Sequence, residues 1–328
     1  MIAYALVAIG ALWLLIEPGF VHPRLTAALF AWWPLLLVGL GLDLVIPKAK
    51  RGPLPVTFYA AGAILLLALL GVPATRAAAT QEYSEALPLS ARSMAATITL
   101  GSTPTTVGSA PSGVTVQGEF VGEPPGLVRL NGAERLELEL RAGRGSPFRL
   151  GRSHWSVALT PALPLDLELR TGSGASTLQL QDLDLSSLTL ESGSGRTSVT
   201  LPGGGQYYAA AIGSGSGRLD VQVQPGASLD LTLQTGSGAA NLTIGEGSDL
   251  QLTLSARSGA VTVALPDAAP IRLEVLSDGS GRLNVPPYLT RRSGNGDKGV
   301  WESAAYANGG RVLNITVADA RSGSITFR

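Results

Sequence analysis

The sequence of 328 residues contains no cysteine and only two histidines, His22 and His154. The absence of cysteine excludes disulfide bonds, thiolate metal sites and cysteine nucleophiles. Two imidazoles nearly exclude a multi-histidine metal site or a histidine proton relay. The 24 basic residues balance the 24 acidic ones, whereas a nucleic-acid partner would need a basic patch. The composition therefore predicts no metal, no cofactor and no nucleic-acid partner.

The longest apolar runs lie near the N-terminus, at Met1–Ile16, Leu25–Ile46 and Pro55–Val72. A membrane-spanning helix needs about 20 apolar residues, with a range of about 17–25. The second and third runs fit this range, and the first reaches it only if tilt or flanking residues extend it. A cleaved signal peptide is the alternative for the first run, although that run lacks a basic N-terminal region. We expect three retained helices in residues 1–72.

Basic residues between the runs set the expected orientation. Lys48, Lys50 and Arg51 form the densest basic cluster near any helix end, which predicts that the loop after the second helix is cytoplasmic. Arg24, in the first loop, opposes this assignment weakly. The N-terminus is then cytoplasmic, and the chain after Val72 lies outside the cell (inner) membrane.

Three residues of the second run are candidate contacts with a membrane partner, namely Trp32, Trp33 and Asp43. Tryptophan rings favour the membrane interface, so contact with the lipid headgroups is the alternative explanation for Trp32 and Trp33. An acidic side chain near a helix end usually reaches the lipid headgroups, and contact with a partner helix is the alternative for Asp43.

A Gly-Ser corner, first seen as Thr171-Gly-Ser-Gly174, recurs at a nearly constant period. Its last glycine stands at positions 174, 195, 217, 238, 259 and 281, and again at 323 after two further periods. Two aliphatic columns keep this period. One column runs Leu167, Leu188, Ala210, Leu231, Leu252, Leu273, Ile315, and the other runs Leu178, Val199, Val221, Leu242, Val263, Val285, Phe327. Apolar and polar residues alternate around both columns, which indicates strands with one buried face.

A unit of about 21 residues is too short for a propeller blade, which needs about 40–45 residues. It fits one coil of a parallel β-solenoid, in which strands of successive coils pair about 4.8 Å apart. Glycine at the corners would permit both positive φ and close backbone approach. The open ends of such a stack would associate with other strands unless they were capped.

The predicted fold is therefore a three-helix membrane anchor followed by an all-β parallel solenoid with capped ends. Aromatic residues are the candidates for the caps: Trp155 at the N-terminal end, and Trp301 and Tyr306 where the period breaks. The expected divisions are an anchor at 1–72, a linker at 73–86, an irregular β cap with the first coils at 87–165, the regular solenoid at 166–287, and a cap insertion with the final coil at 288–328.

No segment of the outer sequence predicts a catalytic or ligand site. Gly294–Gly299 matches the dinucleotide-binding string, but no strand and helix flank it as that motif requires. Asp182–Ser186 resembles the start of a calcium loop and lacks the glycine and final glutamate. His154, beside Trp155, would have to carry Ser-His-Asp catalysis alone, and a structural role is the better interpretation.

Outward positions after the corners carry mostly uncharged polar residues, such as Ser198, Asp220, Asn241, Thr262 and Asn284. A solvated sheet face is the simplest interpretation of this pattern. The alternative is a face that binds an envelope polymer, although aromatic residues for stacking on glycans are scarce there.

Two parts of the sequence resemble a known bacterial family. Trp32–Asp43 is similar to the membrane-helix signature of LiaF-type cell-envelope stress proteins. Arg135–Arg141, Trp155–Pro161 and Leu163–Gly174 resemble the "toast-rack" and "putative-adhesin" β-repeat domains found with it. The resemblance implies a membrane protein that restrains a sensor kinase until the envelope is damaged, and it implies no catalytic residues.

We therefore expect a non-enzymatic, membrane-anchored, extracytoplasmic β-solenoid protein. Its expected role is to sense or regulate envelope stress through a membrane partner such as a sensor kinase or another envelope protein. The alternative is a structural or adhesive module at the cell surface that contacts an envelope polymer. In both cases the lipid bilayer is a partner.

The orientation can be tested because the chain has no native cysteine. We expect Thr232→Cys to react with a membrane-impermeant maleimide in cells whose outer layers are permeable to it. Lys50→Cys, on the cytoplasmic side, should react only after the inner membrane is broken. Labelling is read on gels after pull-down of the protein, and the reverse pattern would invert the orientation.

Overall fold

The computed structural model describes residues 80–122, 124–143, 153–204, 206–277 and 280–328. The three predicted membrane helices, with Trp32, Trp33 and Asp43, lie outside these residues. The chain divides into two compact units, and every described residue belongs to the unit that comprises 80–145 and 153–328. Among the described residues of this unit, no helix is long and apolar enough to cross a membrane.

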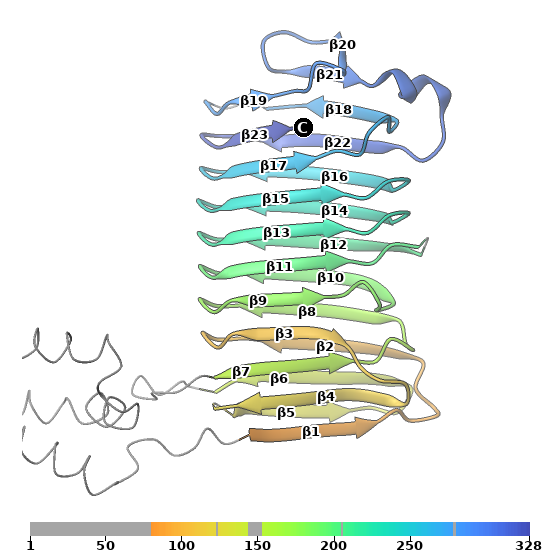
Figure 1. The fold of residues 1–328 in the computed structure, drawn as a ribbon, viewed down its shortest axis with the longest axis vertical. Coiled ribbons are helices and arrows are strands. Elements are labelled where there is room, and N and C mark those ends of the chain that lie inside the picture. The colour runs from red at the N-terminus through yellow and green to blue at the C-terminus, as the bar shows by residue number, and fades with distance from the viewer. Residues whose placement is uncertain (1–79, 123, 144–152, 205, 278–279) are drawn as a thin grey trace, which may run out of the picture. The chain divides into compact units, whose positions relative to one another are not determined.

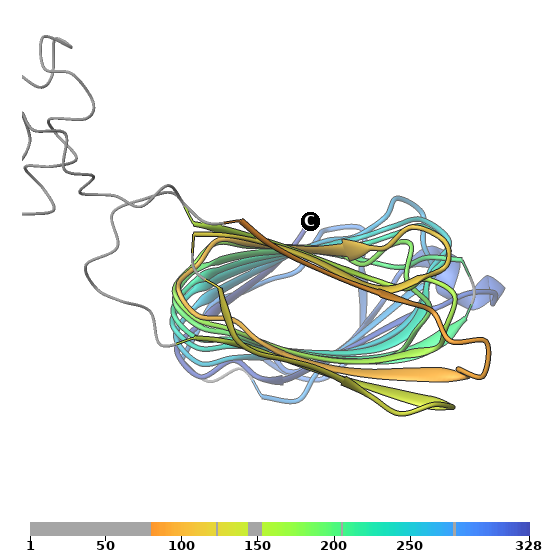
Figure 2. The ribbon, with the colours of Figure 1, turned by 90° about the horizontal axis from the view of Figure 1, so that it is seen from below.

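The unit is built from two facing β-sheets, seen from the side in Figure 1 and end-on in Figure 2. Sheet A has eleven strands in the spatial order β1 (Thr80–Ala86), β4 (Val114–Val121), β7 (His154–Leu159), β3 (Thr105–Ser109), β9 (Ser176–Gln179), β11 (Arg196–Leu201), β13 (Arg218–Val223), β15 (Ala239–Ile244), β17 (Ala260–Ala264), β23 (Ser324–Phe327) and β19 (Leu283–Asn284).

Sheet B lies opposite and has twelve strands. Their spatial order is β20 (Thr290–Ser293), β21 (Gly299–Glu302), β18 (Ile271–Val275), β22 (Leu313–Asp319), β16 (Asp249–Ala256), β14 (Ser228–Thr235), β12 (Tyr207–Ser214), β10 (Leu185–Ser192), β8 (Leu165–Thr171), β2 (Ser93–Thr99), β6 (Arg135–Ala142) and β5 (Pro125–Asn131).

Most strands belong to coils, each of which places one strand in each sheet. Successive coils pair in parallel, as a β-solenoid requires, and the register confirms the predicted columns. Leu188 pairs with Leu167 on one side and Ala210 on the other, and Val199 pairs with Leu178 and Val221. These side chains point between the sheets and are at most 3% exposed. Full burial of one aliphatic side chain stabilises the fold by about 1.5–3 kcal/mol.

The order of the coils differs from their order in the sequence at the C-terminal end. The coil β22–β23 comes last in the sequence, but it lies between β16–β17 and β18–β19 (Figure 1). Ile315 accordingly pairs with both Leu252 and Leu273. The last coil of the sequence therefore lies inside the stack: the chain passes over one coil position, turns back and fills it.

The N-terminal end is interleaved in the same way. The coil β2–β3 lies between β6–β7 and β8–β9, so Ala96 pairs with both Leu138 and Leu167. The predicted linker at 73–86 is also shorter than expected, because residues 80–86 form β1, which pairs with β4 in antiparallel orientation.

Antiparallel strands close both ends of sheet B and the N-terminal end of sheet A, whose other edge is the two-residue parallel strand β19. At one end, β4 pairs with β7 and β5 pairs with β6. At the other end, β21 pairs with β18 and β20 pairs with β21. An antiparallel strand cannot continue the parallel register of the coils, so these strands end the repeat, and charged residues in β1 and β20 protect the outer edges.

The corner glycines serve close packing, and the expectation of positive φ at them is wrong. Positive φ occurs at glycines of other turns, such as Gly204, Gly226 and Gly247. At Gly193 an added Cβ would lie 2.6 Å from the carbonyl oxygen of Gly172, and at Gly238 it would overlap the carbonyl oxygen of Gly217. Each corner lies directly on the backbone of the corner in the preceding coil.

Two glycines of neighbouring coils provide a matched test of this packing. Gly238→Ala should lower the free energy of unfolding by about 3 kcal/mol or more, because its Cβ overlaps backbone that cannot move aside. Gly213→Ala should change it by less than about 1 kcal/mol, because the nearest atom to its Cβ is the Leu190 oxygen at 3.8 Å. Thermal unfolding followed by circular dichroism measures both. Equal effects of the two substitutions would refute the packing explanation.

Candidate functional site

The N-terminal end of the stack contains a buried aromatic pair. Trp155 of β7 and Phe120 of β4 pack edge to face, with ring centroids 5.0 Å apart and an interplanar angle of 84°. Both side chains are 1% exposed. The antiparallel pairing of β4 with β7 places residues 120 and 155 opposite each other. Such a pair stabilises the fold by about 0.5–1.5 kcal/mol beyond what the burial of its apolar area contributes.

At the C-terminal end, Trp301 lies in β21 opposite Leu273 and is 8% exposed. The guanidinium of Arg291 lies 4.9 Å from the centroid of its ring. The Nη2 atom of Arg291 also donates to the carbonyl oxygens of Gly296 and Lys298, both at 2.6 Å. The segment Gly294–Gly299 is thus the turn of the β20–β21 hairpin, a context that differs from a dinucleotide-binding motif.

Tyr306 lies in the short 3-10 helix η2 (Ala304–Asn308), where it is half-buried. Just before this helix, the hydroxyl of Ser303 donates to the carbonyl oxygen of Ala269 at 2.8 Å and accepts from the backbone N–H of Ile271 at 2.9 Å. These two bonds attach the helix to the start of β18. Tyr306 therefore belongs to the connection that carries the chain back toward β22.

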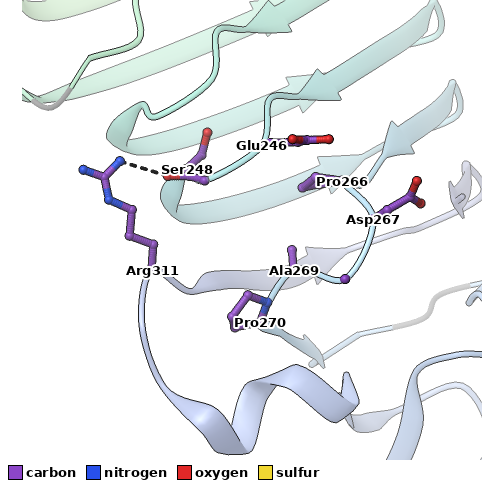
Figure 3. A pocket seen from close by; sticks show the side chains of 9 residues that line it. Glu246, Ser248, Pro266, Asp267, Ala269, Pro270 and Arg311 are labelled. Atoms are coloured by element: carbon purple, nitrogen blue, oxygen red, sulfur yellow. Dashed lines mark hydrogen bonds between the residues drawn. The ribbon is translucent and has the colours of Figure 1, made fainter.

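A cavity of about 260 Å³ opens where the chain passes over the coil position that β22 later fills (Figure 3). Arg311 lies at its side, and its Nη1 atom donates to the carbonyl oxygens of Gly226 and Gly247, both at 2.9 Å. The carboxyl groups of Glu246 and Asp267 also line the cavity. Arg311 thus joins the turns of two successive coils at the entry to the interleaved coil.

The polar groups of this cavity are used to hold the fold. The hydroxyl of Ser248 donates to the carbonyl oxygen of Gly245 at 2.8 Å, and Arg311 is bonded to the two turns. Ala268 has a φ of 57°, an uncommon value for a residue other than glycine, in the segment that passes over the open position. We therefore interpret the cavity as a consequence of the way the chain passes over this coil position, and assign no ligand to it.

A second cavity, of about 220 Å³, lies at the turns after β9 and β11. Asp182 and Asp184 line it, and the side-chain amide of Gln181 donates to Asp182 Oδ2 at 3.2 Å. Tyr208 also lines it, and its hydroxyl donates to the carbonyl oxygen of Pro202 at 2.9 Å. Burial raises the pKa of the Tyr208 phenol above its usual range. In the described part of the chain, no group of three His, Asp or Glu side chains could hold a metal ion.

The remaining candidates lie on the outer surfaces. His154 is exposed at the start of β7. On the outer face of sheet A, a polar column runs through Thr177, Ser198, Asp220, Asn241, Thr262, Thr326 and Asn284. The amide of Asn241 donates to Asp220 Oδ1 at 2.6 Å, which engages the single carboxylate of this column.

The comparisons with known families match two separate segments of the chain. Residues 1–80 match the family model of the LiaF transmembrane domain. Residues 128–222 match the family model of the N-terminal domain of toast_rack. The chain joins a LiaF transmembrane domain to a toast-rack domain. The LiaF domain anchors the protein in the membrane, and neither domain is known as an enzyme.

The toast-rack match extends from β5 to β13, so it includes the coil β6–β7 and the first regular coils, and the interleaved coil β2–β3 lies before it. No curated protein matches the chain. Among solved structures, the chain is similar to a "putative cell adhesion protein" from Clostridium sporogenes ATCC 15579. The sequence identity is 14%, the TM-score is 0.43, and the match covers 76% of this chain and 99% of that one. A likeness at this level carries no functional argument.

Several residues that shape the ends of the β unit were not singled out in the sequence. Phe120 lies in an aperiodic region, and Arg291 and Arg311 act through backbone carbonyls that a sequence pattern does not reveal. Arginines at the corners did leave a signal, because the string Gly-Ser-Gly-Arg ends at Arg196, Arg218 and Arg282.

The raised pKa of Tyr208 predicts a pH dependence of stability. The folded state keeps this phenol neutral, whereas the unfolded chain ionises it near pH 10, so stability is lost as the pH rises above about 10. This single group lowers the free energy of unfolding by at most about 1.4 kcal/mol per pH unit in that range.

The neighbouring tyrosines of β12 provide the control, because Tyr207 is 63% exposed and Tyr208 is 3% exposed. We expect Tyr208→Phe to flatten the alkaline fall of the thermal midpoint between about pH 9 and 11. Tyr207→Phe should leave the wild-type slope unchanged. Identical slopes for all three proteins would show that Tyr208 does not cause the fall.

Proposed function

We propose that this protein is a non-enzymatic regulator of the cell-envelope stress response that acts on a membrane partner, such as a sensor kinase. The observation that carries the proposal is the LiaF transmembrane domain joined to a toast-rack domain in one chain. The second of the three predicted helices would contact the partner inside the bilayer, and the β unit would lie outside the cytoplasmic membrane.

The described unit supports a binding or regulatory role better than a catalytic one. The two cavities described above are small, and Ser248, Arg311 and Tyr208, which line them, are bonded to carbonyl oxygens of the fold. Its interior is filled by stacked aliphatic side chains. The outer faces and edges of the two sheets are therefore the surfaces that this unit offers to other molecules.

Inside the membrane, we propose that Trp32, Trp33 and Asp43 form the contact with the partner. A carboxyl group in an apolar helix is costly unless it reaches the headgroups or a polar group of another helix. Contact with the partner would hold the kinase inactive, and envelope damage sensed by the β unit would weaken that contact.

A deletion strain tests the proposal through its transcript profile, recorded without stress and after a cell-wall antibiotic. We expect a small set of genes to be switched on without stress, because removal of a brake releases the signalling system. Wild-type protein supplied in trans should switch the set off again. An unchanged profile would argue for the structural or adhesive alternative.

Complementation with variants locates the contact. Asp43→Asn should restore the brake incompletely, and crosslinking should recover less of the membrane partner with this variant than with wild type. Trp13→Ala, in the first apolar run, is the control and should restore it fully. If crosslinking recovers no membrane protein with the wild-type chain, the proposed mode of action fails.

A further inference from the structure

The edge of the solenoid formed by the Gly-Ser corners has a distinctive charge. Five of the seven corners carry an arginine beside the invariant Ser-Gly pair. Three arginines directly follow the corner and two precede its serine; in chain order these are Arg196, Arg218, Arg257, Arg282 and Arg321. The whole chain has no net charge, whereas the seven corners and the residues that directly follow them carry five arginines and one acidic residue, Asp278.

Most of these arginines have no acidic partner. Arg321 pairs with Asp319, at 2.8 Å between Nε and Oδ2. Arg257 also lies close enough to Asp319 to stabilise its carboxylate. Arg196, Arg218 and Arg282 form no ion pair with any residue that the structure describes, and all three are exposed. The charges of these three are therefore available to an anion from outside.

Arg196 and Arg218 are the clearest case, because they lie in register on the adjacent strands β11 and β13. Paired strands are about 4.8 Å apart, and like charges directly opposite each other destabilise a sheet. The same position in the next two coils is held by Ala239 and Ala260, so the fold itself does not require arginine there. An anion bound between the two guanidinium groups would remove the repulsion.

The corner serines supply hydroxyl groups beside these arginines. Ser173 donates to Ser102 and Ser280 donates to the carbonyl oxygen of Arg321. In the other corners the exposed serine hydroxyl makes no hydrogen bond with a described residue; these are Ser194, Ser216, Ser237, Ser258 and Ser322. Glycines on either side of most serines leave the backbone accessible to an extended ligand.

The opposite edge of the solenoid has the opposite charge. Its turns carry Asp182, Asp184, Glu246 and Asp267, and Asp249 begins β16 there. Two arginines also lie at this edge: Arg328 beside Leu265, and Arg311, whose guanidinium is bonded to turn carbonyls. This separation of charge would repel an anion from one edge and steer it toward the other.

We propose that the Gly-Ser edge binds a linear polyanion that carries phosphate groups and lies along the stack of coils. Guanidinium groups form paired hydrogen bonds with phosphate oxygens, and serine hydroxyls donate single ones. The serine recurs in every corner and an arginine in five of the seven, with coils about 4.8 Å apart, which favours a polymer over a single phosphate. The inference extends beyond the proposed regulatory role and does not depend on it.

Binding of labelled linear inorganic polyphosphate to the full chain in neutral detergent tests the proposal. Fluorescence anisotropy at low ionic strength should show saturable binding that weakens as salt is added. Arg196→Ala combined with Arg218→Ala should weaken binding by at least about tenfold. Arg196→Lys combined with Arg218→Lys retains the charge and loses the paired hydrogen bonds, so we expect a loss of about threefold.

The matched control is Arg129→Ala combined with Arg328→Ala, which removes the same charge from exposed positions away from the corners. It should weaken binding by less than about twofold. Circular dichroism and the thermal midpoint show whether each variant is folded. If the alanine variant is not folded, the lysine variant provides the decisive comparison with wild type.

Four results would overturn the proposal. They are no binding by the wild-type chain, equal losses in the corner and control variants, equally tight binding of polyglutamate, and displacement of the polymer by inorganic phosphate at the same total phosphate concentration. The third would show attraction to charge alone, and the fourth would show a site for a single phosphate.

Discussion

Direct contact between the backbones of successive corners is the constraint on which the β unit depends. Each corner lies against the corner of the preceding coil, at a distance that leaves no room for a Cβ. This contact keeps the two sheets in the same register along the stack. The aliphatic columns can then lie one above another, and most of the buried apolar surface follows from that alignment. The parallel hydrogen-bonding of both sheets depends on the same spacing.

The same constraint shapes the surface. Bulky side chains do not fit where one corner packs on the next. The corners therefore form a narrow strip of glycine and serine along one edge of the unit. Arginine occurs at two positions of this strip: directly after the last glycine at Arg196, Arg218 and Arg282, and in place of the first glycine at Arg257 and Arg321. The chemistry of the edge is thus restricted to hydroxyl groups, backbone and flanking guanidinium groups.

The sequence predicted the repeat, the strands, the parallel pairing and the inward columns, because each depends on local alternation and a constant period. It could not predict the interleaving of coils. Leu252, Leu273 and Ile315 have equivalent sizes and equivalent positions, so any order of their coils satisfies the hydrophobic pattern equally well. The period also could not separate positive φ from close packing as the reason for glycine, since both favour the same residue.

The candidate site was predicted less completely than the fold. Trp155 and Trp301 stood out because aromatic residues are scarce, but their neighbours Phe120 and Arg291 approach them through antiparallel pairs that lie outside the repeat. Arg311 acts on carbonyl oxygens more than 60 residues away in the sequence, and no side-chain pattern marks such a contact. The membrane contacts Trp32, Trp33 and Asp43 remain predictions.

Interleaving also limits how such a protein can change its length during evolution. A coil added beyond either end would have to separate strands that are already paired with the interleaved coil and its antiparallel cap. A duplication among the regular coils between β10 and β15 disturbs neither end, because each of these coils has its sequence neighbours as its spatial neighbours. The two ends therefore behave as fixed terminal modules, and the distance between them can be set by the number of coils inserted in the middle.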